Sequence, residues 1–462
     1  MASVEKFDDL IIGSGIAGKF AAWTRDNRRR TVIVERGLLG GACPNVACLP
    51  SKNMIWSAKV ISLARRGMEF GIKADSLSVD MAAVQTRKRR MVSQLREIHA
   101  IHTHASGAEL IYGIAQFVAP STVEIELRDG GTRTIEGDRV FLDLGSRAAI
   151  PDVLGLAEAT PMTHVEVLDL DRLPKHLVVL GGGYVGLELS QAFRRFGSDV
   201  TVIEHGAQLA NREDPDVAAA LNDLCVDEGI EVVLDATTRR VEGHSGDRVR
   251  VYISDSRGDR AIDGTDLLIA TGRQANSDGI GLDRTGVQLD EHGYIKTNER
   301  LETTSENIWA MGDCAGSPQF THVGYDDFSI VHANLNGGHR TTLDRLIPFC
   351  MFTDPELARV GKNEVEARRD GIEYRMAKLP MAEILRTSTI SEPRGFIKAL
   401  VAKDSDEILG FTAFGFEASE LMVAMQTAML GHLPYMVLRD AILTHPTMSE
   451  GLNQLLANIP AR

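Results

Sequence analysis

Two cysteines stand five residues apart in the stretch GGACPNVACLPSKN, which runs from Gly40 to Asn53. The chain has five cysteines in 462 residues, too few for a scaffold held together by disulfides. On a regular helix, residues five apart have Cα atoms roughly 8 Å apart and side chains roughly 140° apart around the axis. A Cys43–Cys48 disulfide therefore requires a distorted helix start, and we expect such a bond to be easily reduced.

The surroundings of the pair also favour redox chemistry. Pro44 suits the first turn of a helix, because its missing N–H would have no partner there. A helix dipole lowers the pKa of a thiol in that turn and favours the thiolate. Spacing alone leaves two alternatives open, namely buried cysteines without a role and half of a zinc site. Zinc needs further ligands, and no second C-x-x-C or H-x-x-x-H lies nearby.

Two segments share the pattern of an apolar strand, a G-x-G-x-x-G turn, a helix and a second apolar strand that ends in glutamate. The first copy carries Gly13, Gly15, Gly18 and Glu35, and the second carries Gly181, Gly183, Gly186 and Glu204. The glycines permit a tight turn and a close approach of the backbone to a pyrophosphate, while the acid binds a ribose hydroxyl. One such motif is weak evidence, but two copies in the same context predict two dinucleotide sites.

These segments predict an α/β fold with two Rossmann-like dinucleotide-binding domains. Residues 79–107 predict one long helix, on which the basic run Arg87–Arg90 is expected to form a solvated face. After about residue 341, the strand-like runs RGFIKALVAKD and EILGFTAFGF precede two helical stretches, without a further dinucleotide motif. We therefore expect a separate C-terminal α+β domain.

Composition excludes several classes of protein. The chain is 44% hydrophobic and 25% charged, which is ordinary for a globular protein. Its net charge of −14 argues against nucleic acid or an anionic membrane as a partner. The N-terminus lacks the pattern of a signal peptide, and no apolar run approaches the ~18 residues of a spanning helix. We expect a cytoplasmic protein.

The stretch GGACPNVACLPSK resembles the active-site signature G-G-T-C-x-N-x-G-C-x-P-S-K of the class I pyridine nucleotide-disulfide oxidoreductases. Three more stretches match the family in its order, namely IATGRQAN (269–276), IWAMGDCAG (308–316) and LTHPTMSEGL (443–452). The resemblance covers nearly the whole chain. It implies an FAD-binding domain in two parts (1–148 and 273–340), an NAD(P)-binding domain (149–272) and a C-terminal dimerisation domain (341–462).

The resemblance implies cofactor contacts at both glycine motifs. The first motif would bind FAD, with Glu35 on the adenosine ribose, Asp313 on the ribityl chain and the backbone of Thr321 near the flavin ring. The implied FAD residues are Gly13, Ser14, Gly15, Gly18, Glu35, Arg36, Gly41, Ala42, Lys52, Ala115, Gly145, Ser146, Asp313 and Thr321. The implied residues for the nicotinamide cofactor are Gly181, Gly183, Tyr184, Gly186, Glu204 and Gly272, with Tyr184 gating the pocket.

The resemblance also implies a path for electrons. Hydride would pass from the nicotinamide cofactor to the flavin, beside which Lys52 pairs with Glu188. Electrons would then pass to the disulfide, with Cys48 nearest the flavin and Cys43 as the exchanging thiol.

An acid–base dyad is implied near the C-terminus. His445 would protonate the leaving thiolate, and Glu450 would orient His445. In the family the other subunit supplies this dyad, which implies a homodimer with a shared active site.

The remaining cysteines, Cys225, Cys314 and Cys350, are expected to be inert core thiols.

Several positions depart from the family pattern. Ala42 replaces the usual threonine and Ala47 the usual glycine, and FLDLGSR (141–147) replaces the more usual I-I-A-T-G-S, which leaves the contact there to Gly145 and Ser146. NADPH needs positive charge for its 2′-phosphate. The matching positions here are Glu204 and Ala210, so we expect a preference for NADH over NADPH.

The electron acceptor is the least constrained feature. The chain resembles mercuric reductases and, more closely, the reactive-chlorine-resistance flavoproteins that reduce Cu(II), notably over residues 317–331 and 433–456. Mercuric reductases place tyrosine at the position of His445 and carry a C-terminal cysteine pair, whereas this chain has no cysteine after Cys350. We expect a metal ion, Cu(II) or Hg(II), or an oxidant-stress product as the acceptor.

Two alternatives stay open. The His445–Glu450 dyad favours a small-disulfide reductase or a dihydrolipoamide dehydrogenase, because a metal acceptor does not obviously need a proton donor. A non-enzymatic role, as a subunit of a dehydrogenase complex or a redox sensor, is disfavoured by the intact Cys43, Cys48 and Lys52.

Overall fold

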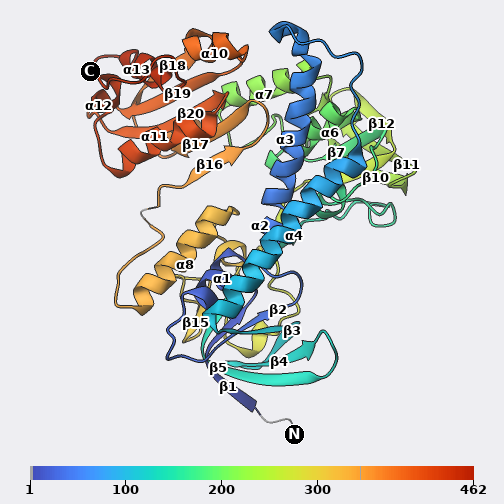
Figure 1. Cartoon of the computed structure of the whole chain (residues 1–462), viewed down its shortest axis with the longest axis vertical. Helices are drawn as coiled ribbons and strands as arrows, with labels where there is room; N and C mark the ends of the chain where they lie inside the picture. The colour runs from blue at the N-terminus through green and yellow to red at the C-terminus, as the bar shows by residue number, and fades with distance from the viewer. Residues whose placement is uncertain (1–3, 344) are drawn as a thin grey trace.

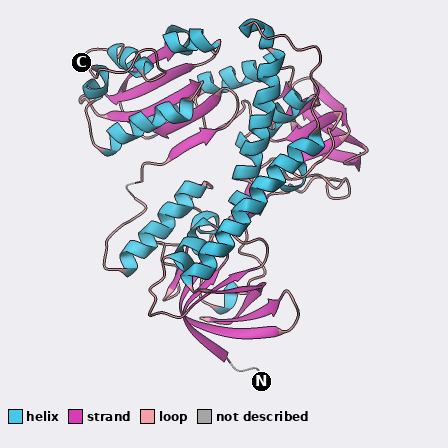
Figure 2. Ribbon diagram, in the orientation of Figure 1, coloured by secondary structure: helices cyan, strands magenta, loops and turns pink. Residues whose placement is uncertain are grey.

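The computed structural model describes residues 4–343 and 345–462, which form three sheet-containing units joined by long helices (Figure 1; Figure 2). The expected α/β fold with two Rossmann-like units and a C-terminal α+β unit is confirmed. The exact domain boundaries stay predictions. None of the described helices is long and apolar enough to cross a membrane.

The first unit contains the first glycine motif. Its sheet comprises β1 (Val4–Ile12), β2 (Thr31–Glu35), β3 (Glu109–Ala119), β4 (Thr122–Leu127), β5 (Thr132–Leu142) and β15 (Ile308–Ala310). The strands β3, β2, β1, β5 and β15 lie parallel, and β4 pairs antiparallel with β3 and β5. All five residues of β2 are buried, as expected for a central parallel strand. The helices α1 (Ile16–Trp23) and α8 (Thr321–Leu335) pack together beside this sheet.

The second unit contains the second glycine motif. Its parallel sheet runs in the order β13 (Asp266–Ile269), β7 (His176–Leu180), β8 (Asp199–Ile203) and β9 (Glu231–Val233). The helices of this unit are α5 (His164–Val167), α6 (Tyr184–Phe196) and α7 (Pro215–Asp227), and an antiparallel sheet joins β10 (Thr237–His244), β11 (Arg248–Asp255) and β12 (Gly258–Gly264). The short strands β6 (Ser146–Ala148) and β14 (Arg273–Ala275) pair where the chain leaves the first unit and returns to it.

The C-terminal unit is an antiparallel sheet with helices packed on it. Its strands run in the order β16 (Pro348–Met351), β17 (Glu356–Gly361), β20 (Ile408–Gly415), β19 (Phe396–Ala402) and β18 (Tyr374–Pro380). Its helices are α9 (Glu364–Arg369), α10 (Leu385–Ile390), α11 (Ala418–Leu430), α12 (Tyr435–Arg439) and α13 (Glu450–Ala457). The helix α11 packs on β17 and β20, and α13 packs on β18 and β19.

Two long helices run between the units, α3 (Cys48–Arg65) and α4 (Met81–Ser106) (Figure 1). The carboxylate of Asp80 accepts a hydrogen bond from the Ala83 N–H at 3.0 Å and caps the start of α4, which confirms the predicted long helix. The expectation of a wholly solvated basic run on α4 is wrong. Lys88 is buried, and its ammonium group lies 2.9 Å from the Asp169 carboxylate, because this part of α4 packs against the second unit.

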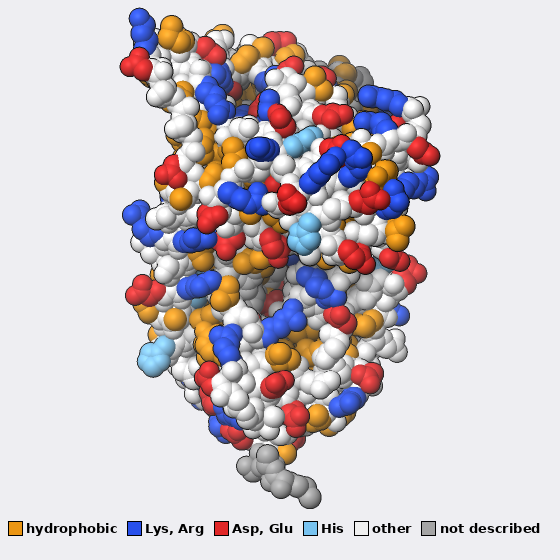
Figure 3. Space-filling model, turned by 90° about the vertical axis from the view of Figure 1, so that its right-hand side faces the viewer, with side chains coloured by type: hydrophobic (Ala, Val, Ile, Leu, Met, Phe, Trp, Pro, Cys, Tyr) orange, Lys and Arg blue, Asp and Glu red, His pale blue; other side chains and the backbone are white. Residues whose placement is uncertain are grey.

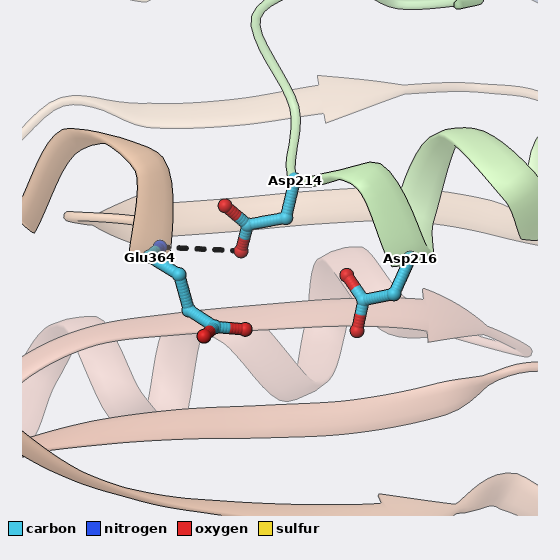
Figure 4. Close-up of side chains that lie close together, drawn as sticks. All are labelled: Asp214, Asp216 and Glu364. Atoms are coloured by element: carbon cyan, nitrogen blue, oxygen red, sulfur yellow. Dashed lines mark hydrogen bonds between the residues drawn. The ribbon is translucent and has the colours of Figure 1, made fainter. Parts of the chain in front are cut away.

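A buried ion cluster ties the second unit to the C-terminal unit. Asp214, Asp216 and Glu364 direct their carboxylates toward one another (Figure 4). The ammonium group of Lys398 lies 2.6 Å, 3.0 Å and 2.9 Å from these three carboxylates in turn. Lys378 also pairs with Asp216, and Arg368 also pairs with Glu364. Three cations therefore balance the three carboxylates without a metal ion. On the face shown in Figure 3, basic and acidic side chains are interspersed.

Replacing this lysine tests the cluster. We expect Lys398→Met to lower the free energy of unfolding by about 3–5 kcal/mol, because three carboxylates then lose their buried counter-ion. Denaturant unfolding of the full chain measures the change. Lys403→Met is the control, since Lys403 pairs with Glu373 on the surface, where such pairs contribute below about 1 kcal/mol. Equal losses in the two variants would contradict the assignment.

Candidate active site

The thiol pair lies at a break between two helices. Cys43 lies in the four-residue helix α2 (Ala42–Asn45), and Cys48 begins α3. Between them Ala47 has φ −134° and ψ −102°, far from helical values. This break is the distortion that the spacing predicts for a bonded pair. Both cysteines are free thiols in this structure and are partly buried.

The two thiols differ in their ionisation. The adjacent Cys43 thiol lowers the pKa of Cys48 to about 6 against the effect of burial, with help from the Thr321 hydroxyl and the Lys52 charge. The Thr321 hydroxyl oxygen lies 3.3 Å from the Cys48 sulfur. Contact with Cys48 and burial raise the pKa of Cys43. Cys48 is therefore the thiol that holds the negative charge at neutral pH.

An ion pair lies one turn along α3 from Cys48. The Lys52 ammonium group lies 2.6 Å from the Glu188 carboxylate, which projects from α6 of the second unit. The Phe352 N–H donates to the other Glu188 oxygen at 2.8 Å, and the Lys52 ammonium lies 4.7 Å from the centre of the Phe352 ring. Phe352 follows β16 of the C-terminal unit, and no sequence pattern predicted its place in the site.

Of the three cysteines expected in the core, two are buried there and one is not. Cys225 and Cys314 are buried. Cys350 is half-buried, and burial together with the Glu356 and Glu188 carboxylates raises its pKa. It therefore lies near the Lys52–Glu188 pair rather than in a closed core.

The first glycine motif forms a cradle held by Glu35. One oxygen of its carboxylate accepts from the Ser14 N–H at 3.0 Å, and the other accepts from the Gly37 N–H. A Cβ added at Gly41 would lie 2.6 Å from the Gly15 Cα, so these backbones approach more closely than any side chain allows. Ala115 is buried in β3, whereas Arg36 is exposed beyond β2.

A second group of predicted residues meets near β6 and β14. The Ser146 hydroxyl donates to the Asp313 carboxylate and accepts from Arg273 Nε at 2.8 Å. A Cβ added at Gly272 would meet nothing within 4 Å, so open space faces this glycine. At Gly145 the nearest atom would be 3.9 Å away. Sequence reasoning missed Arg273, which lies beside the predicted Asp313.

The second glycine motif is built in the same way. The Glu204 carboxylate accepts from the Gly182 N–H at 2.6 Å and from the Gly206 N–H at 2.8 Å. Gly183 precedes α6, and a Cβ added there would meet nothing within 4 Å. Packing requires the other two glycines, since a Cβ at Gly181 would lie 2.4 Å from the Ala270 oxygen and one at Gly186 would lie 2.0 Å from the Gly181 oxygen.

Tyr184, the predicted gate of the nicotinamide pocket, is held in position by a hydrogen bond to Glu213. The Tyr184 hydroxyl donates to the Glu213 carboxylate at 2.8 Å, and burial followed by the Glu213 charge raises the tyrosine pKa. Glu213 in turn lies 3.1 Å from the Arg359 guanidinium of the C-terminal unit. This chain of contacts is invisible in the local sequence.

The C-terminal dyad is assembled but lies apart from the thiols. His445 Nδ1 lies 3.0 Å from the Glu450 carboxylate, and the Thr447 N–H donates to Glu450 at 3.1 Å. The His445 side chain is 64% exposed. Figure 1 places α12 and α13, which flank the dyad, at the upper left, away from α2 near the centre. Within the described chain the dyad therefore faces solvent.

Residues 7–327 match the family described as pyridine nucleotide-disulphide oxidoreductase, and residues 347–456 match the dimerisation domain of that family. The chain belongs to the class I pyridine nucleotide-disulphide oxidoreductases. Family members are FAD-dependent enzymes with a redox-active disulfide. The two glycine cradles fit the two dinucleotides of such an oxidoreductase, because both present close backbone turns and a strand-end glutamate.

This oxidoreductase is similar to two kinds of relative. It is 33% identical over 463 residues to RclA of Escherichia coli, a probable pyridine nucleotide-disulfide oxidoreductase, covering 98% of this chain and 99% of RclA. It is 34% identical over 451 residues to the mercuric reductase of Streptomyces lividans, covering 96% and 94%. The solved Cu(II) complex of RclA superposes with a TM-score of 0.89 at 32% identity over 98% of this chain and 99% of that one.

The Thr321 hydroxyl offers a direct test of the thiol electrostatics. We expect Thr321→Val to raise the pKa of Cys48 by roughly one pH unit, because a charge-assisted hydrogen bond is lost. The rate of alkylation of the reduced oxidoreductase against pH reports the thiolate, with mass spectrometry assigning the label to Cys48.

The matched control is Ser329→Ala on the same helix, whose hydroxyl donates to the Tyr325 carbonyl at 2.9 Å. Its alkylation profile should follow the wild type. Identical profiles for Thr321→Val and the wild type would remove Thr321 from the thiol site.

Proposed function

We propose that this protein is an NADH-dependent FAD oxidoreductase that reduces a metal ion, Cu(II) or Hg(II), or an oxidant-stress acceptor at the Cys43–Cys48 pair. The observation that carries the proposal is the thiol pair at the helix break, where the Thr321 hydroxyl lies 3.3 Å from the Cys48 sulfur and favours the thiolate. A soft thiolate is the ligand that such metal ions prefer. The likeness to RclA, solved as a Cu(II) complex, supports the same acceptor.

Reduction of the metal ion oxidises the thiol pair in the proposed reaction. The reduced pair loses two electrons and closes a Cys43–Cys48 disulfide, while two Cu(II) become two Cu(I), or one Hg(II) becomes Hg(0). The Cys43 thiol releases its proton to solvent, and Cys48 enters the step largely as thiolate. The Cys43 and Cys48 thiols interact across the break between α2 and α3, which places them to close the bond.

FAD, when bound, would relay the two electrons of NADH to the disulfide. Among the chain's own residues, Glu35 and the first motif would hold its adenosine half, and Asp313 with Ser146 would hold the ribityl chain. The Lys52–Glu188 pair would place a fixed positive charge beside the ring, and Tyr184 would cover the nicotinamide pocket. A cytoplasmic location stays a prediction from the sequence.

We propose a homodimer in which each subunit completes the other's active site. The dimerisation domain match and the exposed dyad support this arrangement. Apolar side chains are also exposed around the dyad, with Ile442 fully exposed and Leu433 and Val437 more than one third exposed. A second subunit covering this surface would bury them and bring His445 to the partner's thiols.

A second function has one specific observation in its favour. His445 and Glu450 are held together at 3.0 Å, which is the arrangement of a general acid and its orienting carboxylate. A metal acceptor gives this dyad no obvious task, whereas a leaving thiolate needs a proton. A small-disulfide reductase or a dihydrolipoamide dehydrogenase is therefore the alternative.

The two functions separate in steady-state kinetics. NADH oxidation is followed with Cu(II), Hg(II), lipoamide and glutathione disulfide as acceptors. We expect metal turnover that falls at least 100-fold in Cys43→Ser and changes less than about twofold in His445→Ala, because the thiol pair is redox-active and the dyad is a proton donor.

His292→Ala, a change at an exposed surface histidine, is the control for nonspecific loss. Fast disulfide turnover that collapses in His445→Ala, with slow metal turnover throughout, would establish the alternative function instead.

Cofactor choice is tested at Glu204. We expect the wild type to have a higher kcat/KM with NADH than with NADPH, because the carboxylate repels a 2′-phosphate and accepts from a 2′-hydroxyl. Glu204→Gln removes the charge and keeps one acceptor oxygen for one of the two backbone N–H groups, and it should lower the NADH:NADPH ratio about tenfold. Glu242→Gln on β10 is the control. A wild-type preference for NADPH would overturn the assignment.

A further inference from the structure

A buried carboxylate lies between the two loops of the FAD-binding unit. Asp143 directly follows β5, in the stretch FLDLGSR where the more usual family motif has alanine. Its carboxylate accepts from the Gly18 N–H at 2.7 Å, which is its only hydrogen bond among the described residues. The side chain is almost fully buried.

The carboxylate touches the glycines at which a dinucleotide would lie. A Cβ added at Gly15 would be 2.5 Å from Asp143 Oδ2, and one added at Gly312 would be 3.3 Å from Asp143 Oδ1. Gly15 is the second glycine of the first motif, where the backbone approaches the pyrophosphate. Gly312 precedes Asp313, the predicted partner of the ribityl chain. Asp143 therefore lies under both FAD-binding loops.

The neighbouring charges disfavour a negative charge at Asp143. Burial raises its pKa to about 7 against the Gly18 hydrogen bond, and the carboxylates of Asp313, Asp327 and Glu35 raise it further. These carboxylates come from three different elements, η3 (Gly312–Ala315), α8 and β2.

Of the nearby cations, Lys19 on α1 interacts electrostatically with Asp143, while its ammonium group lies 3.2 Å from His99 Nε2. Arg345 pairs with Asp327 at 2.5 Å, and Arg273 lies 3.8 Å from Asp313. The Cys314 thiol also faces Asp143 and is neutral, because burial and the Asp143 charge raise its pKa to about 12.

We propose that bound FAD favours the protonated form of Asp143, so that above neutral pH binding of the dinucleotide takes up a proton at this carboxyl group. The two phosphate charges of FAD add to the three carboxylates that already surround Asp143, and an ionised aspartate there would repel them. The neutral acid instead keeps its carbonyl oxygen as acceptor for Gly18 and gains an O–H donor that can face the dinucleotide. The reaction is apoprotein with ionised Asp143, one proton and FAD giving holoprotein with neutral Asp143.

The affinity for FAD should fall as the pH rises. Above a pH of about 7 the apoprotein must take up a proton to bind FAD. The dissociation constant for FAD therefore rises toward tenfold per pH unit above that point, until the pH passes the higher pKa of the holoprotein. FAD retention does not depend on the electron acceptor or on the choice between NADH and NADPH.

The experiment measures free FAD over dilute purified holoenzyme by ultrafiltration and flavin fluorescence, from pH 6 to pH 9. The wild type should lose affinity with rising pH. Asp143→Asn carries an amide that imitates the neutral acid in shape and hydrogen bonding, and it should hold FAD with little dependence on pH. Asp138→Asn on the same strand, exposed at the surface, is the matched control and should follow the wild type.

Parallel pH profiles for the wild type and Asp143→Asn would overturn the proposal. If Asp143→Asn does not fold, the wild type still decides the question. Calorimetric binding of FAD at pH 8 in two buffers with different ionisation enthalpies should give an uptake approaching one proton. An uptake near zero, or proton release, would also overturn it.

Discussion

The 2.6 Å contact between Lys52 and Glu188 is the interaction on which the arrangement of this protein depends. It joins the helix that carries the thiol pair to the helix that follows the second dinucleotide motif, and the Phe352 N–H adds the C-terminal unit. A largely buried ion pair gains little net stability over apolar packing, but it penalises any arrangement that separates its partners. The pair therefore fixes the position of the second dinucleotide site relative to the cysteines.

Further buried ion networks act in the same way at greater distance from the thiols. Arg195 bridges Glu228 and Asp354, which joins α6 to the chain after β16. Arg359 bridges Glu213 and Glu366, and so links the C-terminal sheet to the residue that holds Tyr184. Each network joins the second unit to the C-terminal unit. The positioning of the active site is thus distributed over contacts between units rather than concentrated in its loops.

The parts of this arrangement that spacing and turn chemistry predicted are those encoded within about 30 consecutive residues. The Lys52–Glu188 pair, whose members are 136 residues apart, was predicted only through the family resemblance. Both strand–turn–helix motifs, the long helix and the break at the cysteine pair follow from local spacing and turn chemistry. The missed residues act across long sequence separations. The Phe352 N–H donates to Glu188 from the C-terminal unit, and Arg273 on β14 donates to Ser146 on β6. Lys88 is buried because α4 packs against the second unit near Asp169. Nothing near these residues in the sequence reveals their partners.

The break between α2 and α3 has a consequence for how the protein cycles between oxidation states. Cys43 lies on a short, separate turn, whereas Cys48 and Lys52 share a long helix. Bond formation and rupture between the sulfurs can therefore be accommodated by the short turn alone. Closing the disulfide also removes the negative charge of Cys48 one turn from Lys52, so the electrostatic environment of the Lys52–Glu188 pair differs between the oxidised and reduced forms.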